Sequence, residues 1–295
     1  MRVLAGDCGG TNTRLGIFAL EACRWRQIRT ARFRNAEAES FEQVVLEFLG
    51  PRGSGVEAGC VAVAGPVTGR VARLTNLPWV VDADAIEKRT GIQRIELIND
   101  LEAAAWAVPV LGEADTETLN AGAADAVGNG AVIAAGTGLG EAGLFWDGDV
   151  MRPFATEGGH SSFSPTDPMG DDLLRYLRLR FKTVSWERVL SGPGLADLYR
   201  FMLEAEGRPE PDWFTTADAA GDPVPSLSRA GIEGTCETCR ATLRFFARLY
   251  GEESGNLALK VMARGGVWIA GGIAPKILPV LQDGSILRSG SSGIY

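Results

Sequence analysis

A turn rich in glycine and threonine, flanked by two apolar strand-like runs, occurs twice in this chain, once near the start of each half. The first turn lies in Gly6-Asp7-Cys8-Gly9-Gly10-Thr11-Asn12-Thr13-Arg14, and the second in Ala135-Gly136-Thr137-Gly138-Leu139-Gly140. Short apolar runs bounded by turn residues are typical of β-strands. The repeated pattern, in a chain of 295 residues, predicts two related α/β domains rather than a solenoid of short repeats.

The other elements follow from the spacing of apolar residues. In the first half we expect strands at 3–6, 13–19, 27–33, 60–65, 70–74 and 95–98, and helices at 41–49, in the later part of 79–88, and at 101–106. In the second half we expect strands at 131–135, 142–146 and 267–270, and helices over 231–262 and over 167–206 with a break at 191–194. Residues 206–228 are rich in Pro, Asp and Gly, which indicates a surface excursion.

The acidic balance of the chain restricts its partners. The net charge is −8 and the pI is about 4.9, which disfavours nucleic acid because binding to a phosphate backbone needs a concentrated positive face. The opening MRVLAGDCGG lacks the pattern of a secretory signal, and no apolar run reaches about 18 residues. With an odd number of cysteines, five, these features predict reduced thiols in a cytoplasmic protein without membrane association.

Two of the cysteines have the spacing of half a zinc site or of a redox pair. Cys236 and Cys239 have no second pair to complement them, and His160 is the only histidine. A spacing of three places both thiols on one face of the expected helix. We therefore favour two helical thiols over a metal or redox site.

The first glycine turn has the composition of a phosphate-binding loop. Paired glycines after a strand let the backbone approach a ligand and aim N–H groups at it, and the Thr11 hydroxyl adds a donor. Asp7 cannot face a phosphate directly, so it would meet one through Mg²⁺ or its waters. The alternative is a tight hairpin in which glycine supplies positive φ, but the Asp-x-Gly-Gly-Thr-Asn context favours phosphate binding.

The second glycine turn repeats this chemistry, and two such loops could hold the phosphates of one nucleotide. A formal G-x-G-x-x-G is present at Gly138, Gly140 and Gly143. That dinucleotide fingerprint must open a helix, whereas a strand and a turn follow here, so we reject it. The chain also lacks the G-x-x-x-x-G-K-[ST] motif of Walker-type enzymes.

Polar residues with the chemistry of a transfer site lie at three further places. Asn99 and Asp100 stand where an apolar strand meets a helix, where an Asp can accept a hydroxyl proton during attack on a phosphoryl group. The simpler interpretation, a helix cap, is compatible with that role. Glu157, His160 and Glu187 carry groups that bridge sugar hydroxyls, although each taken alone is more often a structural or surface residue.

Eight stretches, in this order, resemble the bacterial glucokinase family. They are AGDCGGTNTRLGIF, VAVAGPV, TNLPWVV, LINDLEAAAWAV, AAGTGLGEAGLF, EGGHSSFSP, ERVLSGPGLADLY and GGVWIAGGIAPKIL, and they extend to about residue 278. The cysteine-rich zinc motif of many related ROK sugar kinases and repressors is not found. The resemblance therefore favours the glucokinase branch.

The resemblance implies a two-domain actin-like ATPase (ribonuclease H-like) fold with an interdomain cleft. It implies transfer of phosphate from MgATP to the 6-hydroxyl of glucose by a cytoplasmic homodimer. Asp100 matches the catalytic base, and Asn99, Glu157, His160 and Glu187 match the sugar-binding set. Residues 6–11 and 136–138 match the two phosphate loops, and Gly271 and Gly272 match the adenosine-side turn before a helix near Pro275. We place a small domain at 1–110 and a large one at 111–278.

Residues 279–295 depart from the family pattern. They end in a Ser- and Gly-rich tail, LeuArgSerGlySerSerGlyIleTyr, which we expect to be poorly ordered. The segment looks like a truncated form of the family's C-terminal region, which braces the small domain. Two alternatives therefore accompany glucokinase: a kinase for another hexose, and a sugar-binding sensor with impaired catalysis.

Overall fold

The chain consists of two compact units, Met1–Ala104 and Ala105–Tyr295. The computed structural model describes residues 1–22, 24–50, 55–74, 77–123 and 125–287. The division between the units lies inside helix α3 (Asp100–Ala107), a few residues before the boundary placed from the sequence. Each unit is built on its own sheet and has its own apolar core.

The first unit is organised around a five-stranded sheet with the order β3-β2-β1-β4-β8. Its strands are β1 (Arg2–Cys8), β2 (Asn12–Glu21), β3 (Arg24–Arg34), β4 (Ala58–Val63) and β8 (Arg94–Asn99). The first three form an antiparallel meander, β4 pairs in parallel with β1, and β8 pairs in parallel with β4. A small antiparallel sheet contains β5 (Val67–Thr68), β6 (Val71–Arg73) and β7 (Val80–Asp82).

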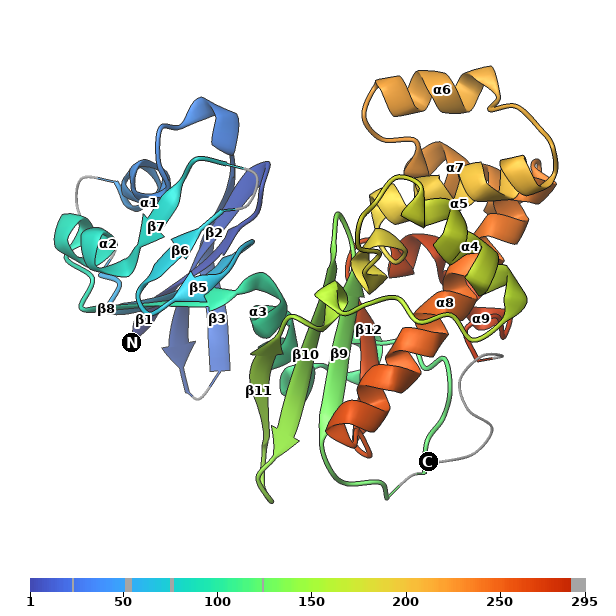
Figure 1. Cartoon of the computed structure of the whole chain (residues 1–295). Helices are drawn as coiled ribbons and strands as arrows, with labels where there is room; N and C mark the ends of the chain where they lie inside the picture. The colour runs from blue at the N-terminus through green and yellow to red at the C-terminus, as the bar shows by residue number, and fades with distance from the viewer. Residues whose placement is uncertain (23, 51–54, 75–76, 124, 288–295) are drawn as a thin grey trace. The chain divides into compact units, whose positions relative to one another are not determined.

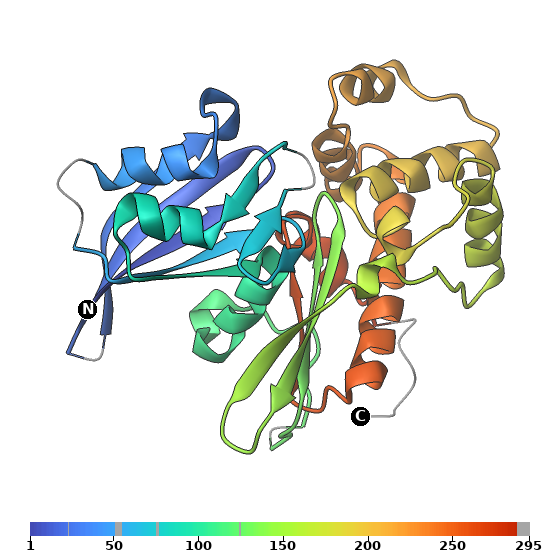
Figure 2. The same cartoon turned by 60° about the vertical axis from the view of Figure 1, so that its left-hand side comes forward.

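Helices α1 (Phe41–Leu49) and α2 (Ala83–Thr90) lie side by side over one face of the large sheet (Figures 1 and 2). Both begin at a side-chain cap, since Ser40 accepts from the N–H of Gln43 and Asp82 from the N–H groups at the start of α2. The apolar stripes of both helices pack with the inward residues of β1, β2 and β4 to form the core of this unit.

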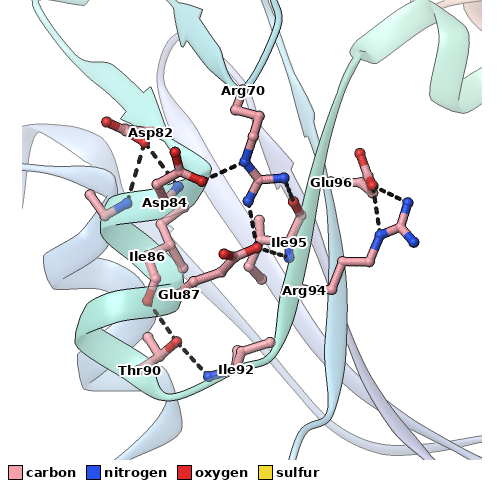
Figure 3. A network of polar contacts seen from close by, with 11 residues as sticks. Arg70, Asp82, Asp84, Ile86, Glu87, Thr90, Ile92, Arg94, Ile95 and Glu96 are labelled. Atoms are coloured by element: carbon pink, nitrogen blue, oxygen red, sulfur yellow. Dashed lines mark hydrogen bonds and ion pairs between the residues drawn. The ribbon is translucent and has the colours of Figure 1, made fainter.

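An ionic network fixes α2 against β8, as Figure 3 shows. The Arg70 guanidinium donates to Asp84 and Glu87 of α2, both at 2.5 Å, and to the carbonyl oxygen of Ile95 on β8 at 3.3 Å. Glu87 also accepts from the N–H of Ile95 at 2.7 Å. Arg70 therefore joins a turn, a helix and a strand, and it holds α2 against the start of β8.

The sheet of the second unit repeats the topology of the first. Its strands are β9 (Gly130–Ala135), β10 (Leu139–Trp146), β11 (Met151–Thr156) and β12 (Gly266–Ala270), in the order β11-β10-β9-β12. An antiparallel meander β11-β10-β9 is again followed by a parallel neighbour, β12. The strand–turn–strand units β1–β2 and β9–β10 thus occupy equivalent places, which confirms the prediction of two related α/β domains.

Helix α8 (Glu237–Val261) runs along the sheet of the second unit (Figure 1) and anchors it. The buried Tyr250 hydroxyl accepts from the N–H of Ala135 at 2.9 Å and lies within hydrogen-bonding distance of the carbonyl oxygens of Ile133 and Ala270. The other helices of this unit are α4 (Pro168–Arg178), α5 (Gly192–Ala205), α6 (Asp212–Ala219), α7 (Val224–Glu233) and α9 (Leu278–Gln282). Together they bury one continuous apolar cluster.

The second unit differs from the expectations in several places. Residues 206–228 are mostly exposed, as expected of a surface excursion, but they also contain α6 and the start of α7. The buried side chains of Phe214 and Leu227 anchor this polar segment to the core. The break in 167–206 comes after α4, and residues 191–194 instead begin α5, whose N-cap is Ser191. Strand β11 was missed because exposed residues obscure its alternation.

The cysteine pair does not lie on one face of a helix. Cys236 is the N-cap residue of α8, and its sulfur accepts from the N–H of Cys239 at 3.2 Å. Only Cys239 is helical, and it is fully buried. The spacing of three is that of a helix cap and its N3 position.

The segment expected to be an atypical tail is only partly described. Residues 278–282 form α9 and 283–287 continue in turns, with Ile286 buried in the core. The expectation of poor order concerns residues 288–295, which lie outside the described residues. No helix of the described part of the chain is long and apolar enough to cross a membrane.

Candidate functional site

The first glycine turn joins β1 to β2 and closes on itself through the backbone. The N–H of Gly9 donates to the carbonyl oxygen of Asn12 at 3.1 Å. Gly9, Gly10 and Thr11 are at least partly exposed. The N–H groups of Gly10 and Thr11, together with the Thr11 hydroxyl, can therefore reach a ligand.

Asn35, a residue that the sequence analysis did not select, holds this turn in place. It lies just beyond β3, it is 2% exposed, and its amide Nδ2 donates to the carbonyl oxygen of Gly9 at 2.7 Å. Its Oδ1 accepts from the Thr13 hydroxyl at 2.8 Å, and its backbone N–H donates to the carbonyl oxygen of Thr11 at 3.0 Å. The only sequence signal is a polar residue at the end of a strand, which is too common to single it out.

The residues of β1 that were assigned to the phosphate loop alternate between two faces. Cys8 is fully buried, and a Cβ atom on Gly6 would meet Val61 and Leu15, so both positions face the core. Burial raises the pKa of the Cys8 thiol to about 11, which keeps it neutral. Cys8 can therefore contribute only its backbone. Asp7, between them, is exposed.

Asp100 lies at the same edge of the sheet as Asp7. The register aligns Cys8 with Val63 and Val63 with Asn99, so the carboxyl ends of β1, β4 and β8 coincide. The pKa of Asp100 is raised, first by desolvation and also by the negative charge of Asp7, against a hydrogen bond from the N–H of Leu101 that lowers it. A raised pKa makes this carboxylate a stronger base.

Asn99 orients the start of α3. Its Oδ1 accepts from the N–H of Leu101 at 2.9 Å, and its Nδ2 donates to the carbonyl oxygen of Gly65 at 3.3 Å. The Asp100 carboxylate accepts from the same N–H group. Both residues thus serve the start of α3, as the cap interpretation predicts.

In the second unit, the glycine turn between β9 and β10 adjoins two other segments. The N–H of Gly136 donates to the carbonyl oxygen of Gly138 at 2.8 Å. The N–H of Gly192, the first residue of α5, donates to the carbonyl oxygen of Gly136, also at 2.8 Å. The N–H of Ile273 donates to the carbonyl oxygen of Ala135 at 3.2 Å. The turn, the N-terminus of α5 and the segment after β12 therefore meet at one place, with the Thr137 side chain exposed there.

Position 271 must be a glycine for this arrangement to form. Its φ of +85° is a conformation that side chains disfavour, and a Cβ atom would lie 2.3 Å from the carbonyl oxygen of Ala135. Gly272 has open space around its Cβ position. The segment that the resemblance assigns to the adenosine side is thus held against the end of β9.

The three residues selected as sugar-binding side chains in the second unit converge. His160 Nε2 lies 3.7 Å from Glu157 Oε2, and His160 Nδ1 lies 3.9 Å from Glu187 Oε1. All three are at least partly exposed, with Glu187 the least, at 32%. We name the segment 157–160, which contains the short helix η4 (Gly158–His160), the sugar loop.

A buried tryptophan brings Glu187 to the sugar loop. Trp186, in the short helix η5 (Trp186–Arg188), is 2% exposed, and its ring packs edge-on against Phe163 at 4.9 Å between centroids. The backbone N–H of Trp186 donates to the carbonyl oxygen of Ser161 at 3.0 Å. The segment that follows the loop is therefore tied to η5.

Glu187 also reaches the second glycine turn. Its Oε2 accepts from the N–H of Leu139 at 3.1 Å, and a Cβ atom on Gly138 would lie 2.5 Å from that oxygen. The sugar loop and the second glycine turn therefore share one carboxylate. The arrangement offers hydroxyl-binding groups beside N–H groups suited to phosphate.

Comparison with known proteins agrees with these features. The family model described as Glucokinase matches residues 4–289. A curated glucokinase of Trichormus variabilis is 36% identical over 97% of this chain and 88% of its own length, and one of Yersinia enterocolitica is 35% identical over 93% and 82%.

Solved structures give the same result. The crystal structure of a glucokinase from an Antarctic psychrotroph is 31% identical, with a TM-score of 0.83 over 99% of this chain and 90% of that one. A ROK family glucokinase from Streptomyces griseus, solved in complex with glucose and AMPPNP, is 20% identical, with a TM-score of 0.66 over 100% and 91%. The second likeness concerns the fold alone.

Proposed function

Because the chain belongs to the glucokinase family and has the actin-like ATPase fold of sugar kinases, we propose that it transfers the γ-phosphoryl group of ATP to the 6-hydroxyl of glucose. The products are glucose 6-phosphate and ADP. The observation that carries the proposal is the position of Glu187, which lies beside His160 and is bonded to Leu139 of the second glycine turn. A hexose and a phosphate site thus adjoin.

Asp100 is the general base of the proposed reaction. Its carboxylate accepts the proton of the 6-hydroxyl while the hydroxyl oxygen attacks the γ-phosphorus and the bond to ADP breaks. Desolvation and the charge of Asp7 raise its pKa, which suits this role. Asn99, anchored to Gly65 and Leu101, orients the sugar beside it.

Glu157, His160 and Glu187 hold the hexose. Carboxylates accept from sugar hydroxyls, and an imidazole can both donate and accept, so the three groups can bridge neighbouring hydroxyls. A sugar fixed this way presents its 6-hydroxyl in one orientation, which lowers the entropic part of the barrier. The proposal requires that these residues and Asp100 act on the same sugar.

The two glycine turns hold the nucleotide. Gly10 and Thr11 in one unit, and Thr137 and Gly138 in the other, present N–H groups and hydroxyls to phosphate oxygens. The N–H groups of Gly9 and Gly136 are bonded within the two turns and shape them. Gly271 and Gly272 lie on the adenosine side. These assignments rest on the resemblance and on the positions described above.

The oxygen donors beside the first turn fit Mg²⁺. Asp7 is exposed at the sheet edge, and its negative charge raises the pKa of Asp100, so a cation there would be favoured by two carboxylates. Asp7 would hold the ion through water. When bound, Mg²⁺ neutralises charge on the phosphate oxygens.

A coupled assay of the full chain with glucose and MgATP tests the proposal. Glucose-dependent formation of ADP is the expected result. No turnover on any hexose, with intact sugar binding by calorimetry, would instead identify a sugar-binding sensor. Comparing kcat/KM for glucose with mannose, fructose and N-acetylhexosamines distinguishes glucokinase from a kinase for another hexose. Light scattering tests the proposed homodimer, and cell fractionation tests the cytoplasmic location.

A further inference from the structure

The carboxyl group of Glu141 is buried directly against the sugar loop. It lies on β10 and is 1% exposed. A Cβ atom on Gly158 would lie 1.9 Å from Glu141 Oε2, so the backbone of the loop rests on this carboxyl. The Thr156 hydroxyl strengthens the connection, since it donates to the carbonyl oxygen of Glu141 at 2.9 Å and accepts from the N–H of Gly158 at 3.2 Å.

A second buried carboxyl faces Glu141 from α8. Glu253 is fully buried, its Oε2 accepts from the Asn256 amide at 2.8 Å, and its Oε1 accepts from Lys260 Nζ at 3.2 Å. Glu141 has no such donors: among the described residues nothing bonds to its Oε1, which is buried.

The two carboxyl groups can approach only if they share a proton. Desolvation, and then the charge of Glu253, raise the pKa of Glu141 to about 7, against the opposing effect of Lys260. Protonated Glu141 can donate to Glu253, which turns a repulsion into a charge-assisted hydrogen bond. Glu141 is therefore protonated in the weakly acidic range and ionises near neutrality.

The groups around this pair are few. From α8 they are Glu253, Lys260 and the Tyr250 hydroxyl, whose own pKa is raised by burial. The cross-strand neighbours of Glu141 on β9 and β11 are Ile133 and Thr156, which do not titrate. The sugar loop contributes Glu157 and His160, whose side chains are 77% and 63% exposed.

We propose that Glu141 is a positioning residue for the sugar loop: its protonated carboxyl, bonded to Glu253, supports Gly158 and thereby holds Glu157 and His160 where they bind the hexose. The inference rests on the proposed function of those two residues. Ionisation of Glu141 places two carboxylates next to each other in a buried space, and their separation or hydration must displace the backbone at Gly158.

The consequence is a pH dependence of sugar affinity. As the pH rises through the pKa of Glu141, the loop loses its support and glucose binds less well. The chemical step at saturating glucose is less affected, because bound sugar itself holds the loop. The KM for glucose should therefore rise while kcat changes little.

The test compares the KM for glucose of the wild type and of Glu141→Gln across neutral pH, with MgATP saturating. We expect the wild-type KM to rise about fivefold or more from acidic to alkaline conditions, and the variant, which cannot ionise, to show a flat profile. Glu252→Gln is the matched control. Like Glu141, Glu252 is a buried carboxyl, but it lies on α8 beside Arg248 rather than against Gly158. It should keep the wild-type rise.

A second variant covers the case in which Glu141→Gln does not fold. Glu253→Gln removes the neighbouring charge, which lowers the pKa of Glu141 and should move the KM rise to lower pH. A flat wild-type profile, or a rise that survives in Glu141→Gln, would overturn the proposal. A wild-type chain without hexose kinase activity at any pH would instead overturn the proposed function, so the two failures are distinguishable.

Discussion

The carboxylate of Glu187 accepts a hydrogen bond from the backbone N–H of Leu139 at 3.1 Å, and so joins a residue selected for sugar binding to the glycine turn selected for phosphate binding. The two segments are far apart in the chain and were chosen for different chemistry. Their connection through one side chain makes the contribution of Glu187 to each ligand measurable.

Replacing Glu187 separates its two roles. Glu187→Gln keeps a carbonyl oxygen that can accept from Leu139, whereas Glu187→Ala loses it. A hydrogen bond to a charged group contributes about 1.5–3 kcal/mol, or roughly 10- to 100-fold in affinity. We expect both variants to raise the KM for glucose, and only Glu187→Ala to raise the KM for ATP. Equal ATP constants in the two variants would show that the contact with Leu139 does not support the turn.

Asp100→Asn tests the general base. The asparagine can still accept from the N–H of Leu101, so the start of α3 should survive. We expect kcat to fall by about 10²- to 10⁴-fold, the usual contribution of general base catalysis, while calorimetric glucose binding is largely retained. Near-normal turnover would assign the proton to another acceptor.

Asn35→Ala tests the support of the first glycine turn. The substitution leaves the carbonyl oxygen of Gly9 and the buried Thr13 hydroxyl without this partner. The unfolding free energy should fall by about 1–3 kcal/mol, and the KM for ATP should rise more than that for glucose. Denaturant unfolding and steady-state kinetics measure both, with the exposed Asn120→Ala as the control.

Gly271→Ala and Gly272→Ala form a matched pair. Only at Gly271 is φ positive, and only there does a Cβ atom meet the carbonyl oxygen of Ala135. We expect Gly271→Ala to lower the unfolding free energy by about 1–3 kcal/mol, as strained backbone does, and Gly272→Ala to leave it nearly unchanged. Thermal melts of the two variants compare them, and similar losses would contradict the described turn.

The titration of Glu141 also affects global stability. Its pKa is about 7 in the folded protein, against 4.5 for the ordinary carboxyl. Between those values the folded state holds a proton that the unfolded state has released, so this group's contribution to stability is full below pH 4.5 and is lost as the pH rises to about 7. The difference in unfolding free energy between the wild type and Glu141→Gln should therefore change across this window and be flat above it.

Much of the fold was predictable because local patterns report local geometry. The apolar spacing of 41–49 matches α1, and the runs around both glycine turns match β1–β2 and β9–β10. Side-chain periods of 3.6 and 2 follow from the backbone of each element alone. Helix α6 was missed because its one buried residue, Phe214, has meaning only through the core it joins.

Local sequence patterns were sufficient to locate the two glycine turns, the strands around them and the residues whose chemistry suits a sugar and a phosphate. Three contacts become visible only once the chain is folded: Asn35 holds Gly9, Gly271 rests on Ala135, and Glu141 meets Glu253 beneath Gly158. Each of these contacts joins residues distant in the chain. Such contacts depend on sheet register and on how helices pack, which no local period specifies.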